Sequence, residues 1–241
     1  MPDINIQIGA HGLFDSAAKN LLAHKNFIPG ISDVVEISAS EYRKHWRAAT
    51  LSGVEHEIEI ARNGDLAARG LGDGARKLHF LCNPNIIGND NAIFKGGVLY
   101  KGAEDRLFNL LSILCDYDPL IKVMICNIDI FAGINNSTAA AISPLLANPW
   151  ADFIERISNI CSGRPLNVYA VSDVTVFCNH LPEILFDTPI DRSRLVKRLL
   201  SEEALNFGNG IDARFAEESH GAYLEDLTKI SKISNVELCI L

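Results

Sequence analysis

The sequence predicts a three-layer α/β domain with a mostly parallel sheet of five or six strands. Short apolar runs alternate with segments whose apolar residues recur at the helical period of 3.6, a pattern typical of strand–helix–strand units. The chain has 241 residues, 48% of them hydrophobic, and it contains no internal repeat or proline-rich linker. We therefore expect one domain that spans residues 1–241.

Six apolar runs are the expected strands, and most of them are nearly continuous rather than alternating. Continuous runs are typical of a parallel sheet that is covered on both faces and whose strands are joined by right-handed crossovers. In chain order they are Ile4–Ile8, Val34–Ile37, Leu78–Cys82, Val123–Ile128, Asn167–Val171 and Val236–Leu241.

Amphipathic segments between these runs are the expected helices. The clearest is the segment after Pro149, in which four large apolar residues share one side. The expected helices are Asp15–His24, Ala103–Cys115, Trp150–Cys161 and Tyr223–Ile233. Asn63–Arg76 and Phe207–Asp212 have the composition of turns, and neither marks a domain boundary.

Composition narrows the classes of function. The chain has 30 acidic and 22 basic residues, for a net charge of −8, which disfavours nucleic-acid binding. An apolar stretch such as Lys122–Ile134 contains Asn127 and Asp129, whereas a bilayer helix needs about 18 apolar residues. The chain begins Met-Pro-Asp-Ile-Asn, without the basic region of a secretory signal. We expect a cytoplasmic protein that contacts neither nucleic acid nor membrane.

The six cysteines form no Cys-x-x-Cys pair, and their spacing predicts reduced, buried thiols rather than disulfides. Cys82, Cys126, Cys178 and Cys239 fall inside strand-like apolar runs. A nucleophilic role for Cys126 is the alternative. It is disfavoured because no basic residue adjoins Cys126 in the sequence to lower its pKa.

The histidines do not predict a metal site. His56-Glu-Ile-Glu59 lacks the second histidine of the His-Glu-x-x-His motif. His11, His79 and His180 would have to meet at strand ends from distant parts of the chain. We therefore expect no bound metal.

The first expected strand is followed by Gly9-Ala-His11-Gly12-Leu-Phe-Asp15-Ser16, a glycine-bearing turn that leads into a helix. This junction is a common anion site in α/β proteins, because free N–H groups and the helix dipole point at the ligand. The turn has no lysine, however, and Asp15 would repel a phosphate while capping the helix. The residues alone therefore favour a self-capped helix over a phosphate site.

The opening strand and turn, Ile6-Gln-Ile-Gly-Ala-His, resemble those of bacterial sulfotransferase-like proteins, whose loop continues Lys-Thr-Gly-Thr-Thr. The resemblance implies a P-loop-type fold. It also implies transfer of a sulfuryl group from 3′-phosphoadenosine 5′-phosphosulfate (PAPS) to a hydroxyl or amine. Further segments match the family in order over most of the chain: Leu78–Gly88, Leu99–Ala103, Val123–Phe131, Leu200–Leu205, Tyr223–Ile230 and Val236–Leu241.

By this resemblance the cofactor would lie against Gly9, Ala10, His11, Gly12 and Ser16. Because it directly follows the first strand, His11 is also a candidate general acid or base, or an anion donor. A surface or capping histidine is the alternative that the residues themselves favour.

The charged donors of the family are absent from their expected places. When the family pattern is aligned with this chain, Gly12 stands at the position of the loop lysine, Phe14 at that of the loop glycine, and Asp15 at that of one hydroxyl residue of the helix. The arginine that binds the 3′-phosphate falls on Cys126, and its partner serine falls on Ile134. Loss of the lysine and the arginine would weaken cofactor binding by about 3–6 kcal/mol, because each charge-assisted donor contributes about 1.5–3 kcal/mol.

Three hypotheses follow. The preferred one is a drifted or non-catalytic sulfotransferase-fold protein that binds an unknown small molecule, a glycan or a protein partner. The second is an active PAPS-dependent transferase in which His11, Ser16 and the Gly9–Gly12 backbone replace the family donors, with the basic segment Glu41–Arg47 near the acceptor. The third is an interaction module without a small ligand, such as a homodimer. Glu41–Arg47 and Arg192–Arg198 are otherwise interpreted as solvated helix faces.

Overall fold

The computed structural model is an α/β protein built around one six-stranded parallel sheet. It describes residues 3–9, 15–64, 78–82, 86–88, 93, 98–127, 149–161, 163–172, 174–187 and 213–241. The sheet order is β2-β3-β1-β4-β5-β6. The strands are β1 (Asp3–Gly9), β2 (Val35–Glu36), β3 (Leu78–Cys82), β4 (Leu120–Cys126), β5 (Leu166–Val171) and β6 (Val236–Ile240).

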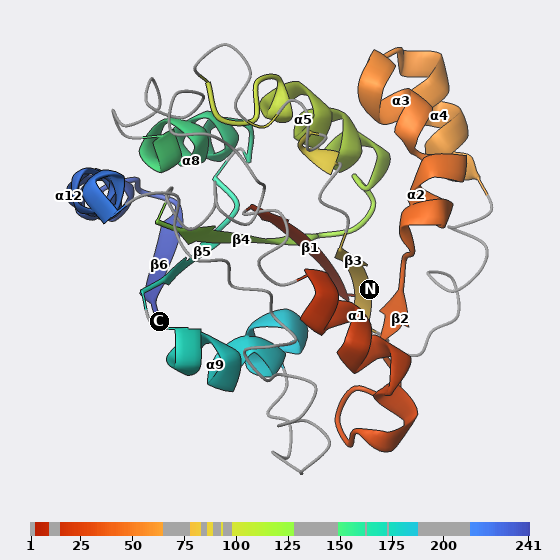
Figure 1. Ribbon diagram of the computed structural model, residues 1–241. Coiled ribbons are helices and arrows are strands. Elements are labelled where there is room, and N and C mark those ends of the chain that lie inside the picture. Colours follow the sequence, from red (N-terminus) through yellow and green to blue (C-terminus); the bar gives the residue numbers. More distant parts are fainter. Residues whose placement is uncertain are drawn as a thin grey trace.

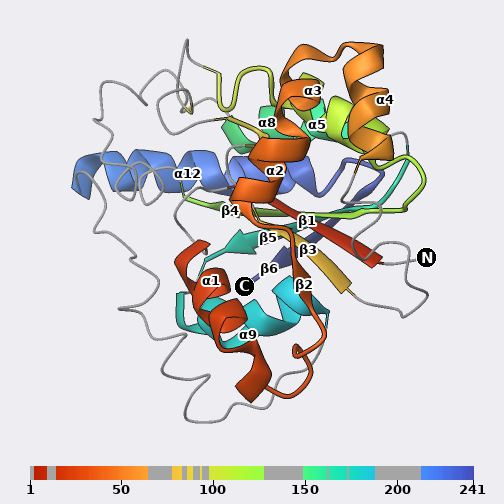
Figure 2. The same cartoon turned by 90° about the vertical axis from the view of Figure 1, so that its right-hand side faces the viewer.

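Helices cover both faces of the sheet and give the predicted three layers (Figure 1). On one face lie α1 (Asp15–Ala23) and α9 (Val174–Phe186), and on the other lie α5 (Ala103–Ile113) and α8 (Pro149–Ile160). Helix α12 (Ala213–Ile230) lies beyond α8 at the β6 edge. At the β2 edge, three helices follow one another from β2 toward α5 (Figure 2): α2 (Ala39–His45), α3 (Arg47–Ser52) and α4 (Glu55–Asn63). The short 3-10 helix η1 (Lys25–Phe27) follows α1.

The apolar runs of the strands form the core, as predicted. Ile4, Ile6 and Ile8 of β1 are buried, and every β4 residue after Leu120 is buried. Strand β4 begins at Leu120, earlier than the predicted Val123. The prediction stopped at Val123 because Lys122 interrupts the apolar run, but this lysine lies within the strand and is fully buried. Continuous burial of a central strand follows from helices packing on both faces of the sheet.

Two helices depart from the sequence prediction. Helix α9 was not predicted, because its sequence begins with β-branched residues and contains Pro182, which removes one backbone donor inside the helix. The assignment of Cys178 to a strand-like run was therefore wrong, since this residue lies in α9. Helix α12 begins at Ala213, earlier than the predicted start at Tyr223. The sequence did not indicate this first part, because it has no apolar period and includes Glu217, Glu218 and His220, which are exposed.

The basic segment Glu41–Arg47 is largely a solvated helix face, as predicted. It forms most of α2, and its first turn is closed by a capping box in which Ser38 and Glu41 exchange side-chain and backbone hydrogen bonds. Tyr42 is buried in the core, while Arg43 is exposed. The aromatic residue of this helix therefore packs inward while the basic side chain meets solvent.

The last turn of α9 is attached to the sheet by a buried cation. The Nζ of Lys122 donates to the carbonyl oxygen of Ile184 at 2.6 Å and contacts Asp187 Oδ1 at 2.6 Å. Asn5 Nδ2 donates to Asp187 Oδ2 at 2.7 Å and to the carbonyl oxygen of Leu185 at 3.3 Å. Burial lowers the pKa of Lys122, and the Asp187 carboxylate opposes that shift. The last carbonyls of α9 thus find donors on β1 and β4, with a positive charge at the negative end of the helix.

Gly9 ends β1 in a conformation that favours glycine. Its φ angle is +117°, and a Cβ atom at this position would lie 2.7 Å from the backbone nitrogen of Met124 and closer still to its carbonyl oxygen. The Gly9 carbonyl oxygen accepts a hydrogen bond of 2.6 Å from Tyr100 Oη. The end of β1 is therefore held tightly between β4 and the segment before α5.

The substitution Gly9→Ala should lower the free energy of unfolding by about 3 kcal/mol or more, because it adds a steric clash to an unfavourable φ angle. Gly163→Ala is the matched control, since Gly163 also has a positive φ, +81°, but its Cβ would meet no atom within 4 Å. The control should cost only about 1 kcal/mol. Chemical denaturation of both variants measures the difference, and equal costs would contradict the close approach to Met124.

Candidate functional site at the carboxyl edge of the sheet

The topology places the candidate site at the carboxyl ends of β1 and β4. These strands are neighbours, but the chain leaves β1 toward β2 at one edge and leaves β4 toward β5 and the other edge. Ligands of open α/β sheets bind in the crevice at such a topological switch point. Gly9 and Cys126 are the last residues of the two strands and therefore mark the floor of the candidate site.

Aromatic side chains donate hydrogen bonds to the last carbonyl oxygens of the strands at this edge. Tyr100 donates to Gly9, and the indole Nε1 of Trp150 donates to the carbonyl oxygen of Cys126 at 2.7 Å. The Oη of Tyr223 lies 3.4 Å from the carbonyl oxygen of Ile125, a β4 residue, and 3.3 Å from the corresponding atom of Val171 at the end of β5. The carboxyl ends of β1, β4 and β5 are thus tied to α8, α12 and the segment before α5.

The aromatic donors form part of one packed cluster. The rings of Tyr100 and Trp150 have centroids 6.4 Å apart, and Phe153 lies 5.1 Å from Tyr100. These separations are within the range of favourable aromatic pairs. The guanidinium carbon of Arg156 lies 5.8 Å from the Phe153 ring centroid, and this cation also pairs with Glu104 at 2.6 Å. The cluster is therefore a rigid support for the edge.

The amino end of α8 is occupied by a carboxylate of the protein itself. Asp226 of α12 is 0% exposed, and its two oxygens accept the backbone N–H groups of Trp150 at 3.2 Å and Ala151 at 2.9 Å. Burial raises the pKa of Asp226 to about 6, although the two N–H groups oppose the shift. The helix end that would otherwise attract an external anion already holds an internal one.

Cys126 is a packed core residue, as the sequence predicted. It is 0% exposed, and burial raises the pKa of its thiol far above the ordinary value. Cys161 is also buried, whereas Cys115 and Cys239 are exposed, so the expectation of burial was wrong for these two residues. A neutral, enclosed thiol can act neither as a nucleophile nor as a ligand for a phosphate group.

Arg106 of α5 is a cation at this edge that the sequence analysis missed. Its Nη1 donates to the carbonyl oxygen of Ile87, just after β3. A Cβ atom on Gly88 would lie 3.5 Å both from this Nη1 and from the Tyr100 ring. Arg106 is half-buried and forms no ion pair with any carboxylate in the described part of the chain. No sequence pattern distinguishes it from an arginine on a helix surface.

Most of the predicted cofactor loop lies outside the described residues. Of its members, Gly9 is described in full, Ser16 lies in the first turn of α1 with its side chain not described, and Ala10, His11 and Gly12 fall outside. The expectation that the loop contacts a cofactor, and the role of His11 as acid or base, therefore stay predictions.

The other predicted histidines do not meet at the carboxyl edge. His79 lies near the amino end of β3, and His180 lies on α9, where its Nδ1 is 3.2 Å from Glu183 Oε2. Within the described ranges, no group of three His, Cys, Asp or Glu side chains has the arrangement of a metal site. Among the described helices, none has the length and apolar character needed to cross a membrane.

Comparison with known proteins found no matching family model, no matching curated protein and no matching solved structure.

The buried carboxyl group predicts an unusual pH dependence of stability. Because the pKa of Asp226 is raised from 3.8 to about 6, the folded state binds this proton more tightly than the unfolded state. This contribution is fully present below the unfolded pKa and is lost as the pH rises through 6, a change of about 2–3 kcal/mol between pH 4 and pH 7.

Urea unfolding of wild type and Asp226→Asn at pH 4, 5, 6 and 7 measures the effect. The stability of wild type relative to the variant should rise as the pH falls, because only wild type carries this titrating group. Glu217→Gln is the control, since Glu217 is exposed on the same helix, and this variant keeps the Asp226 carboxyl group and should follow the pH dependence of wild type. A difference between wild type and Asp226→Asn that is independent of pH would contradict the assignment.

Proposed function

We propose that this chain is a sulfotransferase-like protein that has lost PAPS-dependent transfer and keeps the carboxyl edge of β1 and β4 as a site for another ligand or partner. The observation that carries the proposal is the complete burial of Cys126 beneath the Trp150 indole, at the position where the resemblance requires an arginine. A phosphate bound there would have to be desolvated against a neutral thiol, without a charge-assisted donor.

The surrounding contacts support the same proposal. The Trp150 indole and the Tyr223 hydroxyl are engaged with β-strand carbonyl oxygens, and the amino end of α8 is neutralised by Asp226. Burial raises the pKa of Tyr223, so its hydroxyl stays a neutral donor. PAPS therefore does not fit the described residues at the end of β4.

What the edge retains is a rigid support for a binding loop. Gly9 is fixed between Met124 and Tyr100, and α1 begins at Asp15 on the opposite face from α8. A turn between a central parallel strand and a helix is the usual location of binding residues in α/β proteins. The proposal is therefore a binding function without sulfuryl transfer, and its ligand is a small molecule, a glycan or a protein partner.

The direct test is titration with 3′-phosphoadenosine 5′-phosphate, the desulfonated cofactor. We expect neither calorimetric heat nor a shift in melting temperature up to millimolar ligand, because a ligand at 100 times its Kd would add about 2.7 kcal/mol of stability. Incubation with PAPS and a mixture of hydroxyl and amine acceptors should yield no sulfated product. Micromolar binding or turnover would overturn the proposal.

The position of Arg106 supports a second candidate function, an active transferase in which other residues replace the phosphate donors of the resembled family. This cation lies beside Gly88 and Tyr100, and Tyr100 contacts the end of β1. Together with His11, Ser16 and the loop backbone, its guanidinium would supply the charge that the missing loop lysine supplies in the resembled family. A cation placed near the transferring group is the kind of electrostatic stabilisation on which such catalysis depends.

If the second candidate is correct, Arg106→Ala should weaken binding of the desulfonated cofactor by about 10- to 100-fold, the loss expected for one charge-assisted donor. Arg43→Ala, on the exposed face of α2, should leave the affinity unchanged. Under the preferred proposal neither variant nor wild type binds, so a single set of titrations separates the two candidates.

A further inference from the structure

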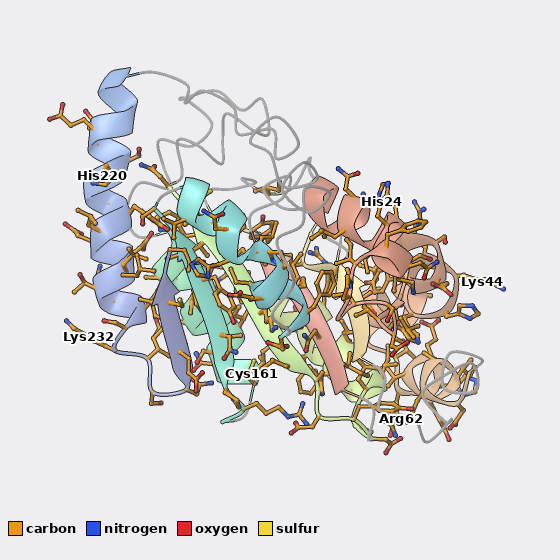
Figure 3. All side chains as sticks on the ribbon, turned by 90° about the horizontal axis from the view of Figure 1, so that it is seen from below. His24, Lys44, Arg62, Cys161, His220 and Lys232 are labelled. Atoms are coloured by element: carbon orange, nitrogen blue, oxygen red, sulfur yellow. The ribbon has the colours of Figure 1, made fainter. Side chains whose placement is uncertain are left out.

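Strand β6 and helix α12 lie together at one edge of the molecule (Figure 3). Strand β6 is the last strand of the sheet, and no described strand pairs with its outer side. Helix α12 runs beside it, with one side packed on α8 through buried residues such as Asp226. Ile240 is 58% exposed and Leu224 is 51% exposed, so large apolar side chains lie on both elements of this edge.

The backbone of β6 alternates between β5 and the open side. Leu241 donates to Ala170 at 2.8 Å and accepts from Ser172 at 2.6 Å, so both of its polar groups face β5. Because peptide groups alternate along a strand, Cys239 and Glu237 face β5 as well, while the N–H and C=O groups of Leu238 and Ile240 and the C=O group of Val236 face outward. The Val236 N–H donates to the carbonyl oxygen of Ile233 at 3.1 Å. The strand has no proline or lysine, the residues that usually protect an edge from pairing.

The exposed side of α12 has a shallow hollow with an apolar centre and charges of both signs. Leu224, Glu225, Thr228, Lys229 and Lys232 line it. Neither Glu225 nor the two lysines form an ion pair with any other residue in the described part of the chain. The charges are ordered along the element, with the acidic group toward the amino end and the basic groups at the carboxyl end.

We propose that the β6–α12 edge pairs with the same edge of a second copy of this chain across a twofold axis. The axis passes beside Leu238, so that the two β6 strands run antiparallel and the sheet continues through both subunits. Leu238 then faces Leu238 of the partner subunit, and Val236 faces Ile240 of the partner subunit. The outward N–H groups of Leu238 and Ile240 donate across the interface to the C=O groups of Leu238 and Val236 of the partner subunit, respectively.

The charges of the edge fit this arrangement. Glu237 falls opposite Cys239 of the partner subunit, so identical carboxylates do not meet directly. The same axis makes the two α12 helices antiparallel, which brings the acidic end of each hollow toward the basic end of the other. Glu225 can therefore pair with Lys232 of the partner subunit. A surface that satisfies both its backbone groups and its charges against its own copy is the requirement for a twofold interface.

The first test is the mass of the full chain in solution, measured by light scattering over a wide range of concentration. Wild type should be dimeric. Leu238→Pro should be monomeric, because proline removes an outward N–H group and leaves the bonds to β5 intact. Leu238→Ala is the matched control. It keeps that N–H group and should remain dimeric, though with weaker association. Monomeric wild type or dimeric Leu238→Pro overturns the proposal.

Charge reversal tests the helices. Glu225→Lys or Lys232→Glu alone should raise the dimer Kd about tenfold, or ~1.4 kcal/mol, because each brings like charges together. The double variant should recover most of the wild-type affinity, since it restores opposite charges across the axis. Failure of the double variant to recover would overturn the antiparallel arrangement of α12.

Hydrogen exchange gives a readout that does not depend on whether Leu238→Pro folds. In dimeric wild type, the amides of Leu238 and Ile240 should be protected, and the protection should fall on dilution. Rapid exchange of these two amides in a dimeric sample would overturn strand pairing. Because the β6–α12 edge is separate from the carboxyl ends of β1 and β4, the outcome is independent of the cofactor titrations.

Discussion

The carboxylate of Asp226 connects more of this structure than any other single group described above. It closes the amino end of α8, and in doing so it fixes Trp150, whose indole holds the last carbonyl oxygen of β4. The same carboxylate belongs to α12, so it also aligns that helix beside β6. Burial of an ionisable group is costly unless it is hydrogen-bonded, and here the two N–H groups of a helix end provide the bonds. This one contact therefore links the support of the candidate site, at the amino end of α8, to the helix of the proposed interface.

Side chains of the protein itself occupy the amino end of α8 and the last carbonyl oxygen of β4 at the carboxyl edge. A cofactor with two phosphate-bearing ends needs helix termini and cations that are free to receive it. In this chain one helix terminus holds Asp226, and the place expected for an arginine holds the packed thiol of Cys126. Arg106 remains beside the end of β3 with a carbonyl oxygen as its only described partner. These internal contacts leave fewer donors for a phosphate group at the end of β4.

The sequence was sufficient where many residues share one physical constraint. Continuous apolar runs identified all six strands, because the central ones are buried on both faces. The roles of single residues that depend on tertiary contacts could not be predicted from the sequence in this way. Because Lys122 interrupts an apolar run, the start of β4 was not predicted, and because Pro182 disfavours a helix, α9 was not predicted. Nothing near Asp226 or Arg106 in the sequence indicates which groups these residues contact. The sequence predicted a candidate site at the end of β1, and the chemistry described near it comes from side chains that only the fold brings there.

The attachment of α9 has an evolutionary consequence. Lys122 is 0% exposed and depends on Asp187, which is 49% exposed, for its charge partner. Loss of the carboxylate would leave a buried cation without its charge partner, and loss of the cation would remove the donor to the carbonyl oxygen of Ile184, so either step alone is costly. Replacement of both by neutral residues is much less costly. In any lineage that descends from this sequence, positions 122 and 187 should therefore diverge together rather than separately.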